Sequence, residues 1–148
     1  MQFLLYGANG YTAQLMLPLA HRYGLTPVLA GRSADKIHTL ARQFGLEFRV
    51  FDLNDPRAVD EGLRDVKAVL NCAGPFAYTA RPMLEACLRT GVHYLDITGE
   101  ISVFELAYSL DVVARQREIT LLPGSGFDVV PTDCLARALY EELPDATH

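Results

Sequence analysis

Two glycines that follow a short apolar run constrain the fold of this chain more than any other feature. Residues 3–6 (Phe-Leu-Leu-Tyr) have the length of a β-strand, and Gly7 and Gly10 come directly after them. Residues 14–23 then have a helical pattern. A strand, a glycine turn and a helix in this order indicate a dinucleotide-binding unit. Gly7 can make the tight turn, Gly10 lets the backbone approach a pyrophosphate, and Ala13 lets the helix pack closely on the strand.

The start of the predicted helix supplies groups that suit phosphates. The first N–H groups of a helix have no acceptor within the helix, and they carry a partial positive charge. Asn9, Tyr11 and Thr12 would present backbone amides there, and the Thr12 hydroxyl would add a further donor. The spacing G-x-x-G-x-x-A is looser than the standard G-x-G-x-x-G. An ordinary glycine turn between a strand and a helix is therefore the alternative.

Size and composition exclude several other classes of protein. A chain of 148 residues, 50% of them hydrophobic, predicts one folded domain with a substantial core. A net charge of −5 without a basic cluster argues against a nucleic-acid partner. The apolar runs are too short for a membrane span or a signal peptide, so we expect a cytoplasmic location. The three cysteines are far apart and do not cluster with histidines, which predicts free thiols and no metal site.

Strand-like and helix-like segments alternate along the whole chain. This alternation predicts an α/β fold, a doubly wound parallel sheet of the Rossmann type with about six strands in the order 3-2-1-4-5-6 and helices on both faces. The expected strands are residues 3–6, 26–30, 47–51, 67–72, 92–96 and 119–122. The expected helices are residues 14–23, 34–44, 56–64, 81–89, 102–116 and 132–142, of which the fifth has a candidate break at Ser109. Ser33 and Asp55 are expected to cap the helices that follow them.

In such a sheet the ligand lies beyond the carboxyl ends of the strands, at the switch point between the first and fourth strands. Where NAD enzymes usually place an acid, after the second strand, this chain has Arg32. Its guanidinium suits a 2′-phosphate, so the sequence favours NADP, with NAD as the second choice. An exposed loop arginine is the alternative. Asp52, after the third strand, either helps to seat the adenine end or makes a turn.

The stretch after the fourth strand, residues 71–76 (Asn-Cys-Ala-Gly-Pro-Phe), is predicted to lie on the other side of the switch point. Gly74 and Pro75 would shape a tight turn along the nicotinamide ribose, and Phe76 would form an apolar wall. Cys72 belongs to the same stretch and is expected to pack there, because the sequence places no base beside it to make it a nucleophile. A simple strand-to-helix turn is the alternative.

Two later stretches add polar and flexible residues at the same edge. Asp96, Thr98 and Glu100 lie at the carboxyl end of the fifth strand, where a carboxylate would either orient the nicotinamide amide or cap the next helix. Residues 123–131 are rich in glycine and proline, which suits a hinge or a ligand lid. Neither stretch identifies a catalytic acid or base.

Five motifs in a fixed order extend the argument from the fold to a family. They are G-A-N-G-Y-T (7–12), A-G-R (30–32), N-C-A-G-P-F (71–76), H-Y-L-D-I-T-G-E (93–100) and G-F-D-V-V-P-T-D (126–133). Together they resemble the N-terminal half of saccharopine dehydrogenase-like oxidoreductases, including the branch similar to trans-acting enoyl reductases. The resemblance implies an NAD(P)-binding domain over residues 1–148. It also implies a following domain, absent from this chain, that shapes the site of a small-molecule substrate and often the homodimer interface.

The predicted function is therefore the cofactor domain of an oxidoreductase, which binds a dinucleotide for hydride transfer and is catalytically incomplete by itself. A non-catalytic dinucleotide sensor or an interaction module on the same fold is the alternative. The Tyr-x-x-x-Lys pair of short-chain reductases is missing, because none of the 7 tyrosines has a lysine four residues later.

Overall fold

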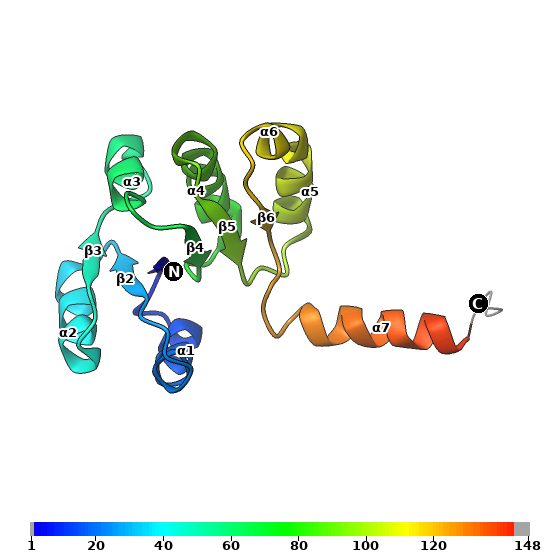
Figure 1. Ribbon diagram of the computed structural model, residues 1–148, viewed down its shortest axis with the longest axis horizontal. Helices are drawn as coiled ribbons and strands as arrows, with labels where there is room; N and C mark the ends of the chain where they lie inside the picture. The colour runs from blue at the N-terminus through cyan, green and yellow to red at the C-terminus, as the bar shows by residue number, and fades with distance from the viewer. Residues whose placement is uncertain (1, 144–148) are drawn as a thin grey trace.

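The computed structural model describes residues 2–143, which form a parallel sheet with helices on both faces (Figure 1). The six strands lie in the order β3-β2-β1-β4-β5-β6, and each adjacent pair is parallel, which confirms the predicted fold class. The strands are β1 (Phe3–Tyr6), β2 (Val28–Gly31), β3 (Phe48–Val50), β4 (Ala68–Asn71), β5 (His93–Asp96) and β6 (Leu121–Leu122).

Helices follow the strands in alternation, as expected. Within the described residues they are α1 (Tyr11–Arg22), α2 (Ala34–Phe44), α3 (Pro56–Gly62), α4 (Phe76–Thr90), α5 (Ile101–Ser109), α6 (Asp111–Gln116) and α7 (Val130–Glu142). The break at Ser109 is confirmed, because α5 ends there and α6 begins at Asp111. Four predicted starts are too late: α4 begins five residues before residue 81, α1 three before residue 14, α7 two before residue 132 and α5 one before residue 102.

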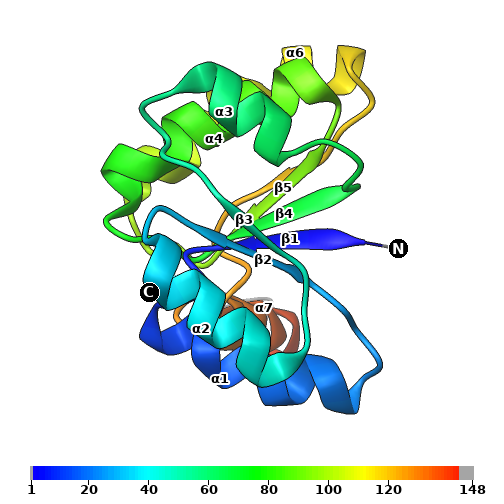
Figure 2. The ribbon, with the colours of Figure 1, turned by 90° about the vertical axis from the view of Figure 1, so that its left-hand side faces the viewer.

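Side chains alternate between two apolar layers, one on each face of the sheet. Leu4 and Tyr6 belong to a cluster with α3, α4, α5 and α6, whereas Leu5 belongs to a cluster with α1 and α2. Figure 2 shows α3, α4 and α6 above the strands and α1 and α2 below them. Because both faces of the central strands are covered, these strands are apolar at almost every position.

Local capping explains several helix ends. The Asp55 carboxylate accepts hydrogen bonds from the N–H groups of Arg57 (3.0 Å) and Ala58 (3.2 Å), as predicted. Ser33 is the N-cap residue of α2, as predicted, but its hydroxyl makes no capping hydrogen bond there. Gly45 and Gly91 end α2 and α4 in the left-handed conformation, with φ of 64° and 73°.

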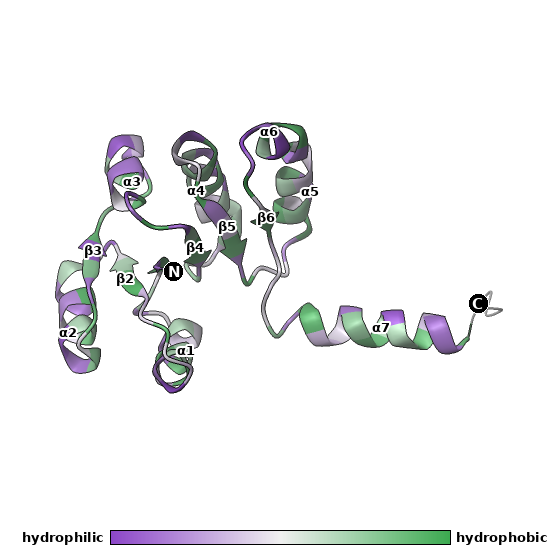
Figure 3. Cartoon of the chain, viewed as in Figure 1, coloured by the Kyte–Doolittle hydropathy of each residue, from purple (hydrophilic) through white to green (hydrophobic). Residues whose placement is uncertain are grey.

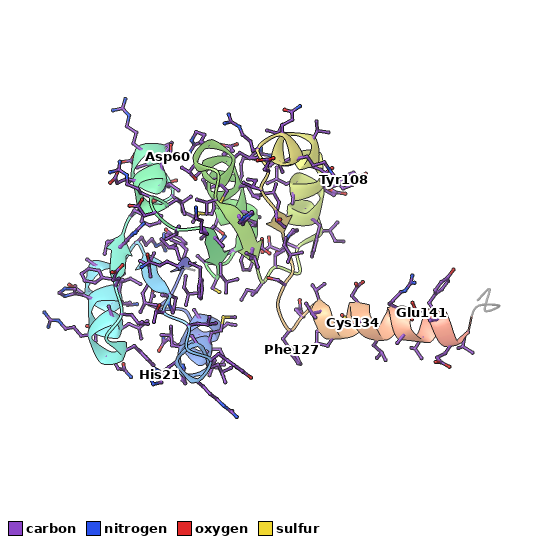
Figure 4. The ribbon with its side chains drawn as sticks, viewed as in Figure 1. His21, Asp60, Tyr108, Phe127, Cys134 and Glu141 are labelled. Carbon is purple, nitrogen blue, oxygen red and sulfur yellow. The ribbon has the colours of Figure 1, made fainter. Side chains whose placement is uncertain are left out.

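The last helix, α7, lies apart from the two apolar layers. It extends away from the sheet in Figure 1, and none of its residues is buried. Figure 3 shows hydrophobic and hydrophilic residues alternating along it, and Leu135 and Leu139 are 60% and 54% exposed. Figure 4 places Phe127 in the preceding loop and Cys134 and Glu141 along the helix.

Residues 2–143 offer neither a membrane-spanning helix nor a cluster of metal ligands. No helix there combines the length and the apolar character needed to cross a membrane. The same residues contain no group of three or more His, Cys, Asp or Glu side chains that could hold a metal ion.

Candidate functional site

The turn from β1 into α1 requires glycine at its first position for two reasons. Gly7 has a φ of +77°, a conformation that residues with a Cβ rarely adopt. A Cβ at Gly7 would also lie 2.8 Å from the backbone nitrogen of Ala73, in the turn that follows β4. The Gly7 N–H donates to the carbonyl of Ala30 in β2 (2.8 Å). The glycine turn therefore fits tightly between the ends of β2 and β4, at the predicted switch point.

The start of α1 is available to an anion. Gly10 is the N-cap and has no side chain to occupy the first N–H groups, and no acidic residue lies in the first turn. In the described part of the chain we find no side chain that caps this helix end. Tyr11 and Thr12, the first two helical residues, are exposed, whereas Ala13 is fully buried against the sheet. This is the geometry in which backbone amides and the helix dipole favour phosphate.

A cleft of about 580 Å³ opens at the carboxyl edge of the sheet, beside the glycine turn. Its lining includes these residues predicted from the sequence: Gly7, Asn9, Gly10, Arg32, Asp52, Cys72, Gly74 and Pro75. Tyr11, Thr12 and Phe76 do not line the cleft, although they begin the two helices beside it. Sequence reasoning missed Ser33, Lys36, Tyr78 and Thr79, which also line it. Lys36 could have been found, since it lies in the first turn of the helix that follows Arg32.

One end of the cleft carries two cations. Arg32 and Lys36 are exposed, and neither takes part in an ion pair among the described residues. Asp52 lies at the same end, and its carboxylate accepts the Asn54 N–H (2.8 Å), so it makes the turn that was one of its two predicted roles. Two cations and one carboxylate give this end a net positive charge.

Tyr6 lies beneath this charged end. Its hydroxyl donates to the carbonyl of Phe51 (3.2 Å). Burial is the main cause that raises the pKa of Tyr6 to about 12, and the negative charge of Asp52 is the second. The positive charge of Arg32 lowers this pKa and opposes part of the shift. The phenol is therefore neutral at physiological pH and acts as a hydrogen-bond donor.

The side of the cleft after β4 is built by a short hydrogen-bonded turn. The Asn71 side chain accepts the Ala73 N–H (3.1 Å), and the Thr79 hydroxyl donates to the Ala73 carbonyl (2.5 Å). The Gly74–Pro75 peptide bond is cis, and both residues are exposed to the cleft. These contacts fix the turn from both sides.

Cys72 lies half-buried in the lining of the cleft. Burial, and next the charge of Asp96, raise the pKa of its thiol to about 12. The thiol is therefore protonated at neutral pH and is a poor nucleophile. This agrees with the packing role expected from the sequence.

Asp96, the last residue of β5, and Glu100, which follows this strand, do not line the cleft. Asp96 is fully buried, and it accepts hydrogen bonds from the Tyr94 hydroxyl (2.6 Å), the Gly124 N–H (2.8 Å) and the Thr98 N–H (3.0 Å). Glu100 accepts from the N–H groups of Phe76 (2.8 Å) and Ala77 (2.7 Å). Neither carboxylate lines the cleft, and both are occupied by these hydrogen bonds. The expected side-chain cap of the helix that begins near residue 102 is wrong, because Glu100, the N-cap of α5, directs its carboxylate to the start of α4 instead.

The loop between β6 and α7 is fastened to the end of β5. Both the N–H (2.8 Å) and the hydroxyl (2.7 Å) of Ser125 donate to the Asp96 carbonyl. Among the described residues, the lining of the cleft contains no member of this loop. The part of the loop held by Ser125 therefore does not cover the cleft as a lid would. Phe127, two residues further along the loop, has a side chain that is 91% exposed.

A second hollow, of about 570 Å³, lies between α5, α6 and the edge strand β6. Its charged lining residues, Asp111 and Arg115, pair with each other (2.7 Å). The hollow lies at the β6 edge of the sheet, and the helix that begins in it, α6, has the acidic Asp111 in its first turn, so we assign no cofactor role to it.

Residues 3–122 match the family described as the saccharopine dehydrogenase NADP binding domain. The chain belongs to this family. It is 28% identical over 152 residues to a saccharopine dehydrogenase-like oxidoreductase of Bos taurus, covering 88% of this chain and 35% of that protein. It is 30% identical over 156 residues to a trans-acting enoyl reductase of Mycobacterium ulcerans, covering 97% of this chain and 36% of that protein. This member of the saccharopine dehydrogenase NADP binding domain family thus spans about a third of the length of these curated relatives.

Solved structures show the same fold. Apo saccharopine dehydrogenase (L-Glu forming) from Saccharomyces cerevisiae superposes with a TM-score of 0.82 at 21% identity, over 98% of this chain and 32% of that one. The Citrobacter sp. triphenylmethane reductase complexed with NADP(H) gives a TM-score of 0.64 at 20% identity, over 82% of this chain and 48% of that one. At these identities the likeness concerns the Rossmann-type fold alone.

Proposed function

We propose that this chain binds NADP(H) in the cleft at the carboxyl edge of the sheet and positions it for hydride transfer. The observation that carries the proposal is the bare start of α1, which lies directly after a turn that only glycine fits at Gly7. NADPH would supply the hydride, while the residues of this chain bind and orient it. Membership of an NADP-binding family supports the choice of ligand.

In this proposal the backbone amides of Asn9, Tyr11 and Thr12 hold the diphosphate, Gly7 makes the turn, and the lack of a side chain at Gly10 lets the backbone approach the ligand. The cradle fits because no side chain of the described residues caps the start of α1 and no acidic residue lies in its first turn.

The two ends of the cleft would hold the two halves of the cofactor. Arg32 and Lys36 would bind the 2′-phosphate, with Asp52 near the adenosine ribose. The turn of residues 74–76 would form the wall along the nicotinamide ribose, with Cys72 packed beneath it. Arg32 is suited to the phosphate because its planar guanidinium can donate two parallel hydrogen bonds.

A titration of the purified chain with NADPH and NADH tests this proposal. Loss of a charge-assisted hydrogen bond costs about 1.5–3 kcal/mol, so Arg32→Ala should weaken NADPH binding by about 10- to 150-fold. NADH binding should change little, because NADH lacks the 2′-phosphate. Arg42→Ala is the matched control, since Arg42 is exposed in the last turn of α2 and does not line the cleft.

Three results would count against the assignment. Equal losses for NADPH and NADH in Arg32→Ala would contradict binding of the 2′-phosphate by Arg32. A similar loss in Arg42→Ala would attribute the effect to general charge. Failure of the unmodified chain to bind either nucleotide at millimolar concentration would refute the function itself.

We also propose that a second domain holds the hydride acceptor. The curated relatives are about three times as long as the matched region, and α7 exposes apolar side chains with no buried residue. On this proposal the chain alone binds NADPH without oxidising it in the presence of carbonyl, imine or enoyl compounds. Oxidation by this chain alone would refute the need for a second domain.

A further inference from the structure

The start of α4 is capped by a residue from a distant loop. The carboxylate of Glu100, which is the N-cap of α5, accepts the N–H groups of Phe76 and Ala77 with its two oxygens, at 2.8 and 2.7 Å. Pro75, the N-cap of α4, has no side chain that could do this locally. The first turn of α4 therefore depends on a contact that spans 24 residues of sequence.

This cap distinguishes the start of α4 from that of α1, which also lies beside the cleft. The start of α1 lacks a side-chain cap in the described residues, whereas the start of α4 already holds a carboxylate. The start of α2, whose N-cap Ser33 lines the cleft, also lacks a side-chain cap. Glu100 therefore occupies the first N–H groups of α4, and an anion in the cleft is left with those of α1 and α2.

Glu100 is itself held by a buried support. Its N–H donates to the hydroxyl of Thr98 (3.0 Å), and the Thr98 N–H donates to Asp96 (3.0 Å). Both Thr98 and Asp96 are fully buried. The backbone of Glu100 is thus attached to the end of β5, and its carboxylate holds the N–H groups of Phe76 and Ala77 from that fixed position.

We propose that Glu100 is a positioning residue for the nicotinamide half of the cofactor. Gly74 and Pro75 line the cleft, and Glu100 does not, so it acts through the turn and not by touching the ligand. The inference rests on the proposed function, because it assumes that the cleft holds NADP(H). On this inference the Glu100 carboxylate, although outside the cleft, fixes the position of the turn of residues 74–76 along the nicotinamide ribose.

The substitution Glu100→Gln removes this support with little change in volume. A carboxylate accepts two hydrogen bonds here, whereas the amide keeps one acceptor and turns an NH₂ donor toward the other N–H. The start of α4 then loses one of its two hydrogen bonds to residue 100, while the bonds of Ala73 to Asn71 and Thr79 remain. The lost hydrogen bond lies within the protein and not to NADPH, so it lowers the affinity only because the turn is less well ordered in the free chain. We expect the affinity for NADPH to fall severalfold, up to about tenfold. Adenosine 2′,5′-bisphosphate lacks the nicotinamide half, so its affinity should stay within about twofold.

The experiment measures dissociation constants for both ligands in the unmodified chain, Glu100→Gln and the control Glu105→Gln. Glu105 is an exposed residue of α5, so its substitution should change neither constant. Arg32→Ala serves as the reciprocal variant, since it should weaken both ligands. The fluorescence of bound NADPH gives a second readout, because a looser wall should shift its emission toward that of free NADPH in Glu100→Gln only.

The outcomes separate the inference from the function on which it rests. An unmodified chain that binds neither ligand refutes the proposed function. Binding by the unmodified chain, together with equal losses or no loss for the two ligands in Glu100→Gln, overturns the role of Glu100 alone. If Glu100→Gln does not fold, amide spectra of the unmodified chain decide the matter. The Phe76 and Ala77 signals must then shift with NADPH and not with adenosine 2′,5′-bisphosphate, and the opposite result overturns the inference.

Discussion

Replacing Gly7 with alanine tests how tightly the glycine turn fits against the end of β4. Two energetic effects should add. A left-handed residue with a Cβ costs roughly 1–2 kcal/mol. The new Cβ would also lie 2.8, 2.9 and 3.0 Å from the backbone nitrogen, Cβ and Cα of Ala73, so the backbone must shift. Such overpacking costs about 1–3 kcal/mol. We therefore expect the free energy of unfolding to fall by about 2–5 kcal/mol.

Gly91→Ala is the matched control for this experiment. Gly91 has a φ of +73°, close to the +77° of Gly7, but an added Cβ would meet no atom within 4 Å. It should therefore show the conformational cost alone, about 1–2 kcal/mol. Urea unfolding at constant m-value measures both changes. NADPH affinity should fall at least tenfold in Gly7→Ala, because the shifted turn moves the amides of α1, and it should be unchanged in Gly91→Ala.

Two results would refute this reasoning. Equal destabilisation by the two substitutions would mean that the approach of Gly7 to Ala73 has no energetic consequence. Unchanged NADPH affinity in a folded Gly7→Ala chain would mean that the position of the turn does not matter for the ligand.

Helix caps and cysteine reactivity give two further predictions. Asp55→Ala should lower the free energy of unfolding by about 1 kcal/mol, and Ser33→Ala should lower it by less than about 0.5 kcal/mol. The reason is that the Asp55 side chain caps its helix and the Ser33 side chain does not. Equal losses in urea unfolding would contradict this prediction. At pH 8 iodoacetamide should label the exposed Cys134 much faster than Cys72 or Cys87, because burial raises the pKa of both inner thiols, that of Cys72 to about 12. Since the thiolate reacts, labelling of Cys72 should increase steadily as the pH rises toward 12. Mass spectrometry measures the rates, and equal rates for Cys72 and Cys134 at pH 8 would contradict the prediction.

Much of the fold could be predicted because it depends on local patterns. Apolar runs mark the strands, and alternation with helices, together with right-handed crossovers, determines their order. The glycine turn was also predictable, since a turn position with a positive φ, such as that of Gly7, favours glycine. The sequence did not indicate that Gly7 also lies against Ala73, because that contact joins residues 66 positions apart.

The mistakes came from contacts between distant segments. The start of α4 was predicted too late, because the cap that allows it to begin at Phe76 comes from Glu100 and is invisible in the local sequence. Asp96 was a candidate for binding the cofactor, since a carboxylate at a strand end is equally suited to that role. Only the fold shows that Tyr94, Thr98 and Gly124 occupy its oxygens.

The most direct measurement of diphosphate binding at α1 is a crystal structure of this chain with NADP⁺. We predict that diphosphate oxygens lie at hydrogen-bond distance, about 2.7–3.2 Å, from the backbone N–H groups of Tyr11 or Thr12, with the 2′-phosphate beside Arg32. A diphosphate bound at the start of α4, or a cofactor that leaves those amides of α1 without a phosphate partner, would contradict the proposal.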